Sequence, residues 1–200
     1  MKKEVTSEKK SAFTVRELTF SAVFTALIAV CSWISIPLTV PITLQTFAVF
    51  AAIAFLGTKC STASIAVYIL LGAVGVPVFA GFKGGLSALF GTTGGYIVGF
   101  IFCPIIVALI TKLFGNWGEK LVVRFLAMAV ALVVLYAFGT AWFILVYTRS
   151  TGAVTLVQAL KWCVTPFVIF DLIKIALALI LENRVGKLVN IRPKAVKEEA

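Results

Sequence analysis

The sequence contains no histidine, a single aspartate and few acidic residues of any kind. Only 8 of its 200 residues are Asp or Glu. Without histidine, a zinc site would need clustered cysteines, but the four cysteines are scattered through apolar segments with no C-x-x-C spacing. They are Cys31, Cys60, Cys103 and Cys163. We therefore expect no metal site and interpret these cysteines as buried packing residues.

The sequence also lacks a nucleotide-binding loop and a catalytic constellation. No segment has the G-x-x-x-x-G-K-[ST] spacing that cradles nucleotide phosphates, so we expect no ATP hydrolysis by the chain itself. No nucleophile and base are spaced as a membrane enzyme would need them. We predict a protein that is not an enzyme, with no catalytic residues and no cofactor.

Apolar residues are what the chain has in abundance. It is 61% hydrophobic and 13% charged, with a mean hydropathy of +1.09, which no soluble globular class shares. Its net charge of +10 lies at the termini and in short loops rather than along one face, so we do not expect nucleic acid as a partner. The composition predicts an all-α integral membrane protein in a lipid bilayer.

Six apolar segments predict a single bundle of six transmembrane helices over residues 14–189, between tails at 1–13 and 190–200. Thr14 and Glu17 have capping-box spacing and begin a helix that runs to Ile36 and ends at Pro37. The next four spans are expected at 44–56, 61–76, 95–110 and 121–147. After a polar connection at 149–161, the sixth begins at an N-cap and N1 pair, Thr165 and Pro166.

Two of these segments carry further expectations. The first apolar run is about as long as a full span and has no A-x-A-like site after it, so we expect it to stay in the mature chain. The second span is too short, at about 1.5 Å per residue, to cross ~30 Å of hydrocarbon. We therefore expect the proline-containing loop before it, residues 37–43, to pack within protein near the outer surface.

The basic residues predict which side each loop faces. With six spans, 14 of the 18 Lys and Arg residues lie on one side, three (Lys83, Arg149 and Lys161) lie on the other, and Lys174 is within the membrane. By the positive-inside rule both termini are cytoplasmic, and the chain is a multi-pass protein of the cell (plasma) membrane. The proline loop, the glycine-rich loop and the start of the last span then share the outer face.

Asp171 and Lys174 lie within the otherwise apolar last span, three residues apart and therefore on one helix face. An ionisable residue at mid-helix costs about 2.5–3.5 kcal/mol on insertion scales, so two of them need a reason. One reason is an ion pair that only holds the bundle together. The other is a ligand site, because an acceptor and a donor side by side can bind a molecule that carries both kinds of group.

The first span separates small from large side chains. Six small residues fall within one arc of its helical projection: Ser21, Ala22, Thr25, Ala26, Ala29 and Ser32. Small faces let helix backbones approach closely. This face either packs inside the bundle or docks another membrane subunit.

Glycine is concentrated between the third and fourth spans, in PVFAGFKGGLSALFGTTGGY at 77–96. Such density permits positive φ and lets successive N–H groups turn toward an anion. The alternative is a flexible hairpin that only connects two spans.

Four motifs along the chain resemble the BioY family, the biotin-binding substrate subunits of energy-coupling factor transporters. They are WISIPLTVPITLQT at 33–46, GVPVFAGFKGG at 75–85, GTTGGY at 91–96 and PFVIFDLIKIALA at 166–178. Together they cover nearly the whole chain. The family usually has Pro where this sequence has Thr92, which puts the local turn in question.

The resemblance implies a high-affinity subunit that captures biotin outside and delivers it inward with an ATP-driven coupling module. Asp171 and Lys174 would bind the ring end of biotin, and Lys83 with the glycine-loop amides would meet its carboxylate. The glycines concerned are Gly84, Gly85, Gly94 and Gly95. Gln45 and Tyr96 are further candidates, each equally consistent with a structural role.

The implied partners are a transmembrane coupling subunit and two cytoplasmic ATPases, and the resemblance implies that Ala22 and Ala26 contact the coupling subunit. The alternative is a proton-coupled secondary transporter of a small vitamin-like solute. Such transporters usually contain relays of intramembrane Asp, Glu or His, whereas this chain has one central carboxylate and no histidine.

Overall fold

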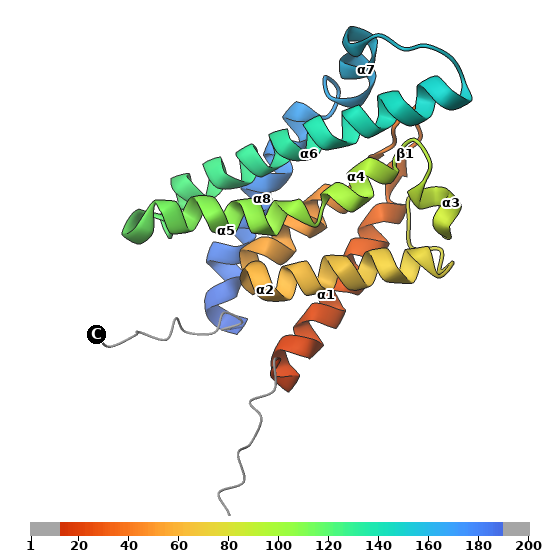
Figure 1. Ribbon diagram of the computed structural model, residues 1–200. Helices are drawn as coiled ribbons and strands as arrows, with labels where there is room; N and C mark the ends of the chain where they lie inside the picture. Colours follow the sequence, from red (N-terminus) through yellow and green to blue (C-terminus); the bar gives the residue numbers. More distant parts are fainter. Residues whose placement is uncertain (1–12, 190–200) are drawn as a thin grey trace, which may run out of the picture.

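The structure is a computed structural model that describes residues 13–189, so the predicted tails lie outside the described residues except for Phe13. The chain folds into a bundle of helices with one two-stranded antiparallel hairpin (Figure 1). The helices are α1 Val15–Trp33, α2 Gln45–Ala73, α3 Leu86–Leu89, α4 Gly94–Gly99, α5 Phe102–Leu113, α6 Leu121–Ser150, α7 Leu156–Cys163 and α8 Val168–Val189; β1 is Ser35–Ile36, β2 is Ile42–Thr43, and a 3-10 turn spans Gly115–Trp117. The prediction of an all-helical membrane bundle is confirmed, apart from the short hairpin.

The first helix begins as predicted and ends early. Thr14 Oγ1 accepts a hydrogen bond from the N–H of Glu17, and the Glu17 carboxylate accepts one from the N–H of Thr14, so the capping box is present. The predicted end at Ile36 is wrong, because the helix stops at Trp33. The residue before a proline favours extended backbone, and Ile36 before Pro37 pairs with Ile42 in the β1–β2 hairpin.

The second helix folds back on itself at Gly57. This glycine has φ 70° and ψ −176°, a conformation open only to glycine. The Gln45 side-chain amide donates to the Tyr68 hydroxyl at 3.0 Å, although 23 residues of straight helix would separate them by about 35 Å. The two arms, orange and yellow in Figure 1, therefore lie against each other. They correspond to the predicted second and third spans.

The packing of α1 on α2 divides the predicted small-residue face. Ser21 Oγ donates to the Cys60 carbonyl, and Thr25 Oγ1 donates to the Ser64 carbonyl at 3.1 Å, so these side chains pack inside the bundle. Ala22 and Ala26 are exposed. The interpretation as internal packing is thus right for part of the face and leaves the two alanines available.

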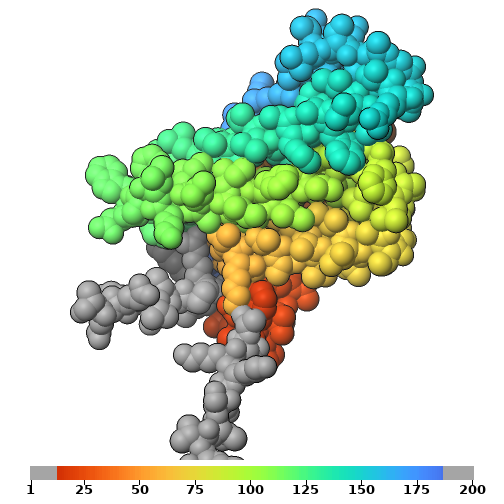
Figure 2. All heavy atoms as spheres, viewed as in Figure 1, coloured from red at the N-terminus to blue at the C-terminus, as the bar shows by residue number. Residues whose placement is uncertain are grey.

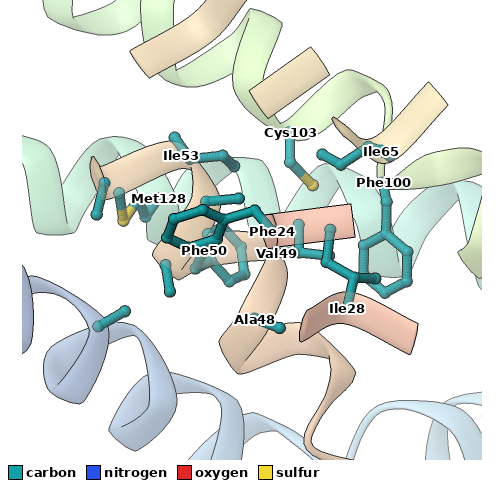
Figure 3. Packing of buried hydrophobic residues seen from close by; sticks show 14 of the residues in the cluster. Phe24, Ile28, Ala48, Val49, Phe50, Ile53, Ile65, Phe100, Cys103 and Met128 are labelled. Atoms are coloured by element: carbon teal, nitrogen blue, oxygen red, sulfur yellow. The ribbon is translucent and has the colours of Figure 1, made fainter. Parts of the chain in front are cut away.

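The central core lies where α1, α2, α4, α5, α6 and α8 meet (Figure 3). Phe24 and Ile28 of α1 pack against the first arm of α2, and Ile65 extends the core from the second arm. All four cysteines are buried, as predicted. A second, smaller cluster around Val40 and Phe143 joins the β1–β2 hairpin to α6, α7 and the segment before α8, and Tyr96 and Tyr136 pack against both clusters.

The glycine-rich segment is tied to α2. Phe79 and Lys83 form an isolated β-bridge, and the Gly85 N–H donates to the Gly72 carbonyl at 2.6 Å. A Cβ at Gly72 would overlap the Phe79 ring, so only glycine fits at this position. The segment is therefore held against α2, which argues against a flexible hairpin that only connects two spans.

The start of the last span differs from the prediction. Thr165 does not cap it; its hydroxyl donates to the Leu160 carbonyl at the end of α7, and α8 begins at Val168. The connection predicted at 149–161 contains most of α7, which begins with its own capping box between Thr155 and Gln158 and ends at Cys163. The space-filling view shows the α7 region projecting at one end of the molecule (Figure 2).

Within the described residues, four helices are long and apolar enough to cross a membrane: α1, α2, α4 with α5, and α6. The bent pair α7 and α8, with an angle of 43°, makes a fifth if counted as one span. The count of six crossings and the side of the termini stay predictions. The β1–β2 hairpin, α3 and α7 all lie toward one end of the molecule, and the α5–α6 connection lies at the other (Figure 1).

Candidate ligand-binding site

Asp171 lies in the first turn of α8, and its carboxylate is the centre of a buried hydrogen-bond network. Oδ1 accepts from Thr46 Oγ1 at 3.0 Å and from Lys174 Nζ at 2.8 Å, and Oδ2 accepts from the Tyr136 hydroxyl at 2.7 Å. Its exposed fraction is 2%. Because α8 begins at Val168, Asp171 lies close to the helix N-terminus, where the helix dipole stabilises a carboxylate.

Lys174 is also buried, with 8% exposed, and its ammonium is fully hydrogen-bonded. Nζ donates to the Thr43 carbonyl at 2.6 Å, to Asp171 Oδ1 at 2.8 Å and to Thr46 Oγ1 at 3.3 Å. The prediction that Asp171 and Lys174 share one helix face is confirmed, and the ion pair that was one of the two interpretations of their spacing is present. Each charge therefore has a partner, which offsets much of the cost of placing both in an apolar bundle.

A cavity of about 650 Å³ lies beside this pair. Its walls are the β1–β2 hairpin, the start of α2, the glycine-rich segment, α4, the middle of α6 and the junction of α7 with α8. Asp171, Thr46 and Tyr136 line it, whereas Lys174 is not among its lining residues. Ligand pockets of small molecules have volumes of about 300–1,000 Å³, so the size suits a small organic ligand.

Gln45 and Tyr96 both line the cavity, and both have a hydrogen-bond partner. Gln45 donates to Tyr68, and the Tyr96 hydroxyl shares a hydrogen bond of 2.9 Å with Thr140 Oγ1. Among residues 13–189, no donor is hydrogen-bonded to the Gln45 side-chain oxygen. The structure therefore places both residues at the cavity and also gives each a hydrogen bond within the bundle.

Lys83 and Gly84 line the cavity at its glycine-rich wall. The Lys83 side chain is exposed, and no hydrogen bond or ion pair of its ammonium occurs among residues 13–189. A Cβ at Gly84 would press on the carbonyl of Val76, so the glycine permits a close backbone approach. Of the predicted anion-binding group, these two residues face the cavity.

Gly85, Gly94 and Gly95 are not among the lining residues. The Gly85 and Gly94 amides already donate to backbone carbonyls, those of Gly72 and Gly91. A Cβ at Gly94 would overlap the Leu89 carbonyl, and one at Gly95 would overlap Trp142. Gly94 and Gly95 therefore pack closely against their neighbours, whereas Gly85 has a positive φ of 87°, which favours glycine.

Three polar residues of the network were missed in the sequence: Thr43, Thr46 and Tyr136. Thr46 both donates to Asp171 and accepts from Lys174, and Tyr136 reaches the same carboxylate from α6. Hydroxyl residues are common in apolar helices, where they often bond to their own backbone. The one signal in the sequence is indirect: a buried carboxylate needs hydrogen-bond donors, and hydroxyl residues of neighbouring spans can supply them.

The site contains no arrangement for metal binding. Across residues 13–189, no group of three or more His, Cys, Asp and Glu side chains is close enough together to hold an ion. Every buried side-chain nitrogen and oxygen in the described part has a hydrogen-bond partner. The site offers the carboxylate of Asp171 as a hydrogen-bond acceptor beside the hydroxyl groups of Thr46 and Tyr136, within apolar walls.

The fold and the site together define an integral membrane protein with a small-molecule cavity at one end of its bundle. The chain belongs to the BioY family, whose model matches residues 2–191, as the sequence motifs predicted. It is 42% identical to the biotin transporter BioY of Thermotoga maritima over 176 residues, 87% of this chain and 98% of the relative. With the probable biotin transporter BioY of Pyrococcus horikoshii it shares 38% identity, over 84% of this chain and 95% of the relative.

A solved structure has a similar fold. The S-component for biotin from an ECF-type ABC transporter superposes with a TM-score of 0.73 at 28% identity, covering 88% of this chain and 95% of that chain. These relatives are transport proteins, in agreement with the prediction that this chain is not an enzyme.

Proposed function

We propose that this chain is the biotin-binding S-component of an energy-coupling factor transporter, capturing biotin with high affinity from outside the cell. The main support for the proposal is that the buried carboxylate of Asp171 lines the cavity and can accept one more hydrogen bond. An ionised carboxylate offers about four acceptor positions, and three are occupied, two on Oδ1 and one on Oδ2. The free position is on Oδ2.

Biotin matches this arrangement chemically. Its ureido group carries two N–H donors, which suit a carboxylate, and charge-assisted hydrogen bonds of this kind are stronger than neutral ones. Its sulfur ring and aliphatic tail suit the apolar walls formed by Phe79, Phe100 and Leu135. The pair of Asp171 and Lys174 forms the subsite for the ring end in this proposal.

The tail carboxylate of biotin would lie toward the glycine-rich wall. Lys83 supplies a cation there, and Ser87 and Thr92 supply hydroxyl groups to the same part of the cavity. Thr92 stands where the family usually has proline, and its hydroxyl is an additional donor. Gly84 lets the backbone lie close to the ligand, whereas Gly85, Gly94 and Gly95 support the fold of this wall.

The proposed topology has six crossings with both termini in the cytoplasm of a plasma-membrane protein. The two arms of α2 supply two crossings, and α1, α4 with α5, α6 and α8 supply the others. The grouping of the β1–β2 hairpin, α3 and α7 at one end supports this arrangement, because those segments border the cavity that receives ligand from outside.

A transmembrane coupling subunit and two cytoplasmic ATPases would drive release of biotin to the inside. The chain itself has no nucleotide-binding loop, so the energy must come from partners. Ala22 and Ala26, one turn apart and exposed on α1, form the proposed contact with the coupling subunit, since small residues allow close helix approach.

Uptake measurements separate this function from proton-coupled transport. Cells that express the chain with its coupling module should accumulate labelled biotin in the presence of a protonophore and lose accumulation when the ATPase subunits are inactivated. Accumulation that stops with the protonophore and continues without active ATPases would support the secondary transporter instead.

A further inference from the structure

The turn that carries Lys83 contains an unfavourable backbone conformation. The Phe79 N–H donates to the Lys83 carbonyl at 2.9 Å, and the chain reverses direction between these two residues. Inside the turn, Gly81 has φ 71° and Phe82 has φ 56°. Glycine adopts this left-handed region readily, whereas a side chain makes it unfavourable. Within residues 13–189, Phe82 is the only residue other than glycine with a positive φ, so contacts outside the turn must hold it there.

A ring stack on the end of α1 supplies such a contact. The rings of Trp33 and Phe82 have centroids 5.0 Å apart and an interplanar angle of 25°, within the range that aromatic pairs favour. The Trp33 indole N–H donates to the Pro77 carbonyl at 2.9 Å, which fixes the indole ring. Ser32 Oγ donates to the Val78 carbonyl beside it. The end of α1 therefore contacts the glycine-rich segment both at its start and at the turn.

The stack lies behind the cavity wall and not in it. Gly81, Lys83 and Gly84 line the cavity, whereas Trp33 and Phe82 do not. Phe82 is 64% exposed, so burial in the core does not hold its ring in place. No side-chain hydrogen bond or ion pair fixes Lys83 in the described part of the chain. The position of its ammonium at the cavity therefore depends on the backbone of the turn.

We propose that Trp33 and Phe82 are positioning residues, which hold the turn at 79–83 so that Lys83 faces the carboxylate of the ligand. Neither ring touches the ligand, yet the stack determines how strongly the site prefers a tail that ends in a carboxylate over a neutral one. The identity of the ligand rests on the proposed function, whereas the effect of the stack on the turn of the ligand-free protein does not.

The first test is amide hydrogen exchange of the ligand-free protein. Phe82→Ala removes the ring but keeps a Cβ at positive φ, so the turn should open more often. The amides of residues 79–84 should then exchange about three- to tenfold faster, the effect of losing one ring stack. Trp33→Leu, which removes the partner ring, should act in the same way, whereas Phe82→Tyr keeps the stack and should exchange like the wild type.

The matched control for the first test is Phe90→Ala. Phe90 belongs to the same segment and is 66% exposed, close to the 64% of Phe82. In the described part of the chain it stacks on no other ring. Its removal should leave the exchange of residues 79–84 unchanged.

The second test compares biotin with biotinamide, in which a neutral carboxamide replaces the tail carboxylate. The ratio of the biotinamide Kd to the biotin Kd measures recognition of the carboxylate. It should be at least about tenfold in the wild type, the effect of one hydrogen bond between charged groups, and should approach one in Lys83→Gln. Phe82→Ala should lower the ratio at least about threefold, whereas Phe82→Tyr and Phe90→Ala should keep it. A loss of stability alone would weaken both ligands equally and leave the ratio unchanged.

Three results would overturn the proposal. Unchanged exchange of residues 79–84 in Phe82→Ala would mean that the stack does not hold the turn. Faster exchange with a wild-type ratio of Kd values would mean that recognition of the tail does not depend on the stack. A wild-type ratio in Lys83→Gln would remove the role of Lys83 and with it the role of the stack in binding. Failure of the wild-type protein to bind biotin at all would instead refute the proposed function, and the exchange experiment would still decide whether the stack holds the turn.

Discussion

Replacing Asp171 by asparagine should weaken biotin binding strongly while the protein remains folded. The asparagine keeps one acceptor oxygen, which can face Lys174 and Thr46 as Oδ1 does. Its NH₂ group then takes the place of Oδ2 and faces the Tyr136 hydroxyl and the cavity. A biotin N–H would meet a donor instead of an acceptor.

The size of the effect follows from the bond that is lost. A hydrogen bond to a charged group contributes about 1.5–3 kcal/mol, so Kd should rise about 10- to 150-fold. The measurement is calorimetric titration of the folded, monodisperse fraction in detergent, with thermal unfolding of the same preparation. The free energy of unfolding should also fall, because Lys174 loses its counter-ion, although its ammonium keeps the Thr43 carbonyl, Thr46 Oγ1 and the asparagine oxygen as acceptors.

The matched control is the partly buried ion pair between Arg124 of α6 and Glu182 of α8. Arg124 Nη1 and Glu182 Oε2 lie 2.9 Å apart, and their side chains are 9% and 12% exposed, against 10% and 3% for Lys174 and Asp171. Glu182 is about 16 Å further along α8, on the side away from the cavity. Glu182→Gln should lower stability and leave biotin affinity unchanged.

In the alternative interpretation, the ion pair of Asp171 only supports the fold. Then Asp171→Asn would lose stability while its folded fraction kept wild-type affinity, and the double variant with Lys174→Met would recover stability. A Kd within about threefold of wild type, less than 0.7 kcal/mol, would refute the ligand role.

Three further predictions concern other parts of the bundle. Ala22→Trp with Ala26→Trp should abolish co-purification with the coupling subunit and cut uptake, yet leave biotin binding intact; loss of both would mean that this face packs inside the bundle. Gly57→Ala should lower the free energy of unfolding by about 1–3 kcal/mol because φ 70° with ψ −176° is open only to glycine, and unchanged denaturant unfolding would contradict the fold-back of α2. Gly72→Ala should lower the free energy of unfolding by about 1–3 kcal/mol, because the new methyl group displaces the Phe79 ring. Since that ring lines the cavity, biotin binding should also weaken. Equal affinity would show that the ring moves away from the cavity.

Local signals in the sequence predicted much of the fold. The capping box of Thr14 and Glu17 and the break at Gly57 were readable because each depends on residues close together in the chain. The β1–β2 hairpin and α7 were not predicted. The hairpin has only two residues in each strand, too few for a recognisable alternation of side chains. The capping box of Thr155 lies in a segment that was interpreted as a polar connection.

Part of the site could also be predicted, because two of its residues are close together in the sequence. Asp171 and Lys174 stand out because charge is rare in an apolar span and their spacing places them on one face. Thr46 and Tyr136 reach the carboxylate from other helices, 125 and 35 positions away, and nothing local marks such partners. The difference between glycines that face the cavity and those that pack, such as Gly94 against Leu89, likewise depends on contacts across the fold.

The most direct measurement of the central claim is a biotin titration of the purified chain without its partners. The account predicts saturable binding of one biotin per chain, well below millimolar, and markedly weaker binding in Asp171→Asn but not in Glu182→Gln. The absence of saturable binding by the folded wild-type protein in that range would contradict the assignment of this cavity to biotin.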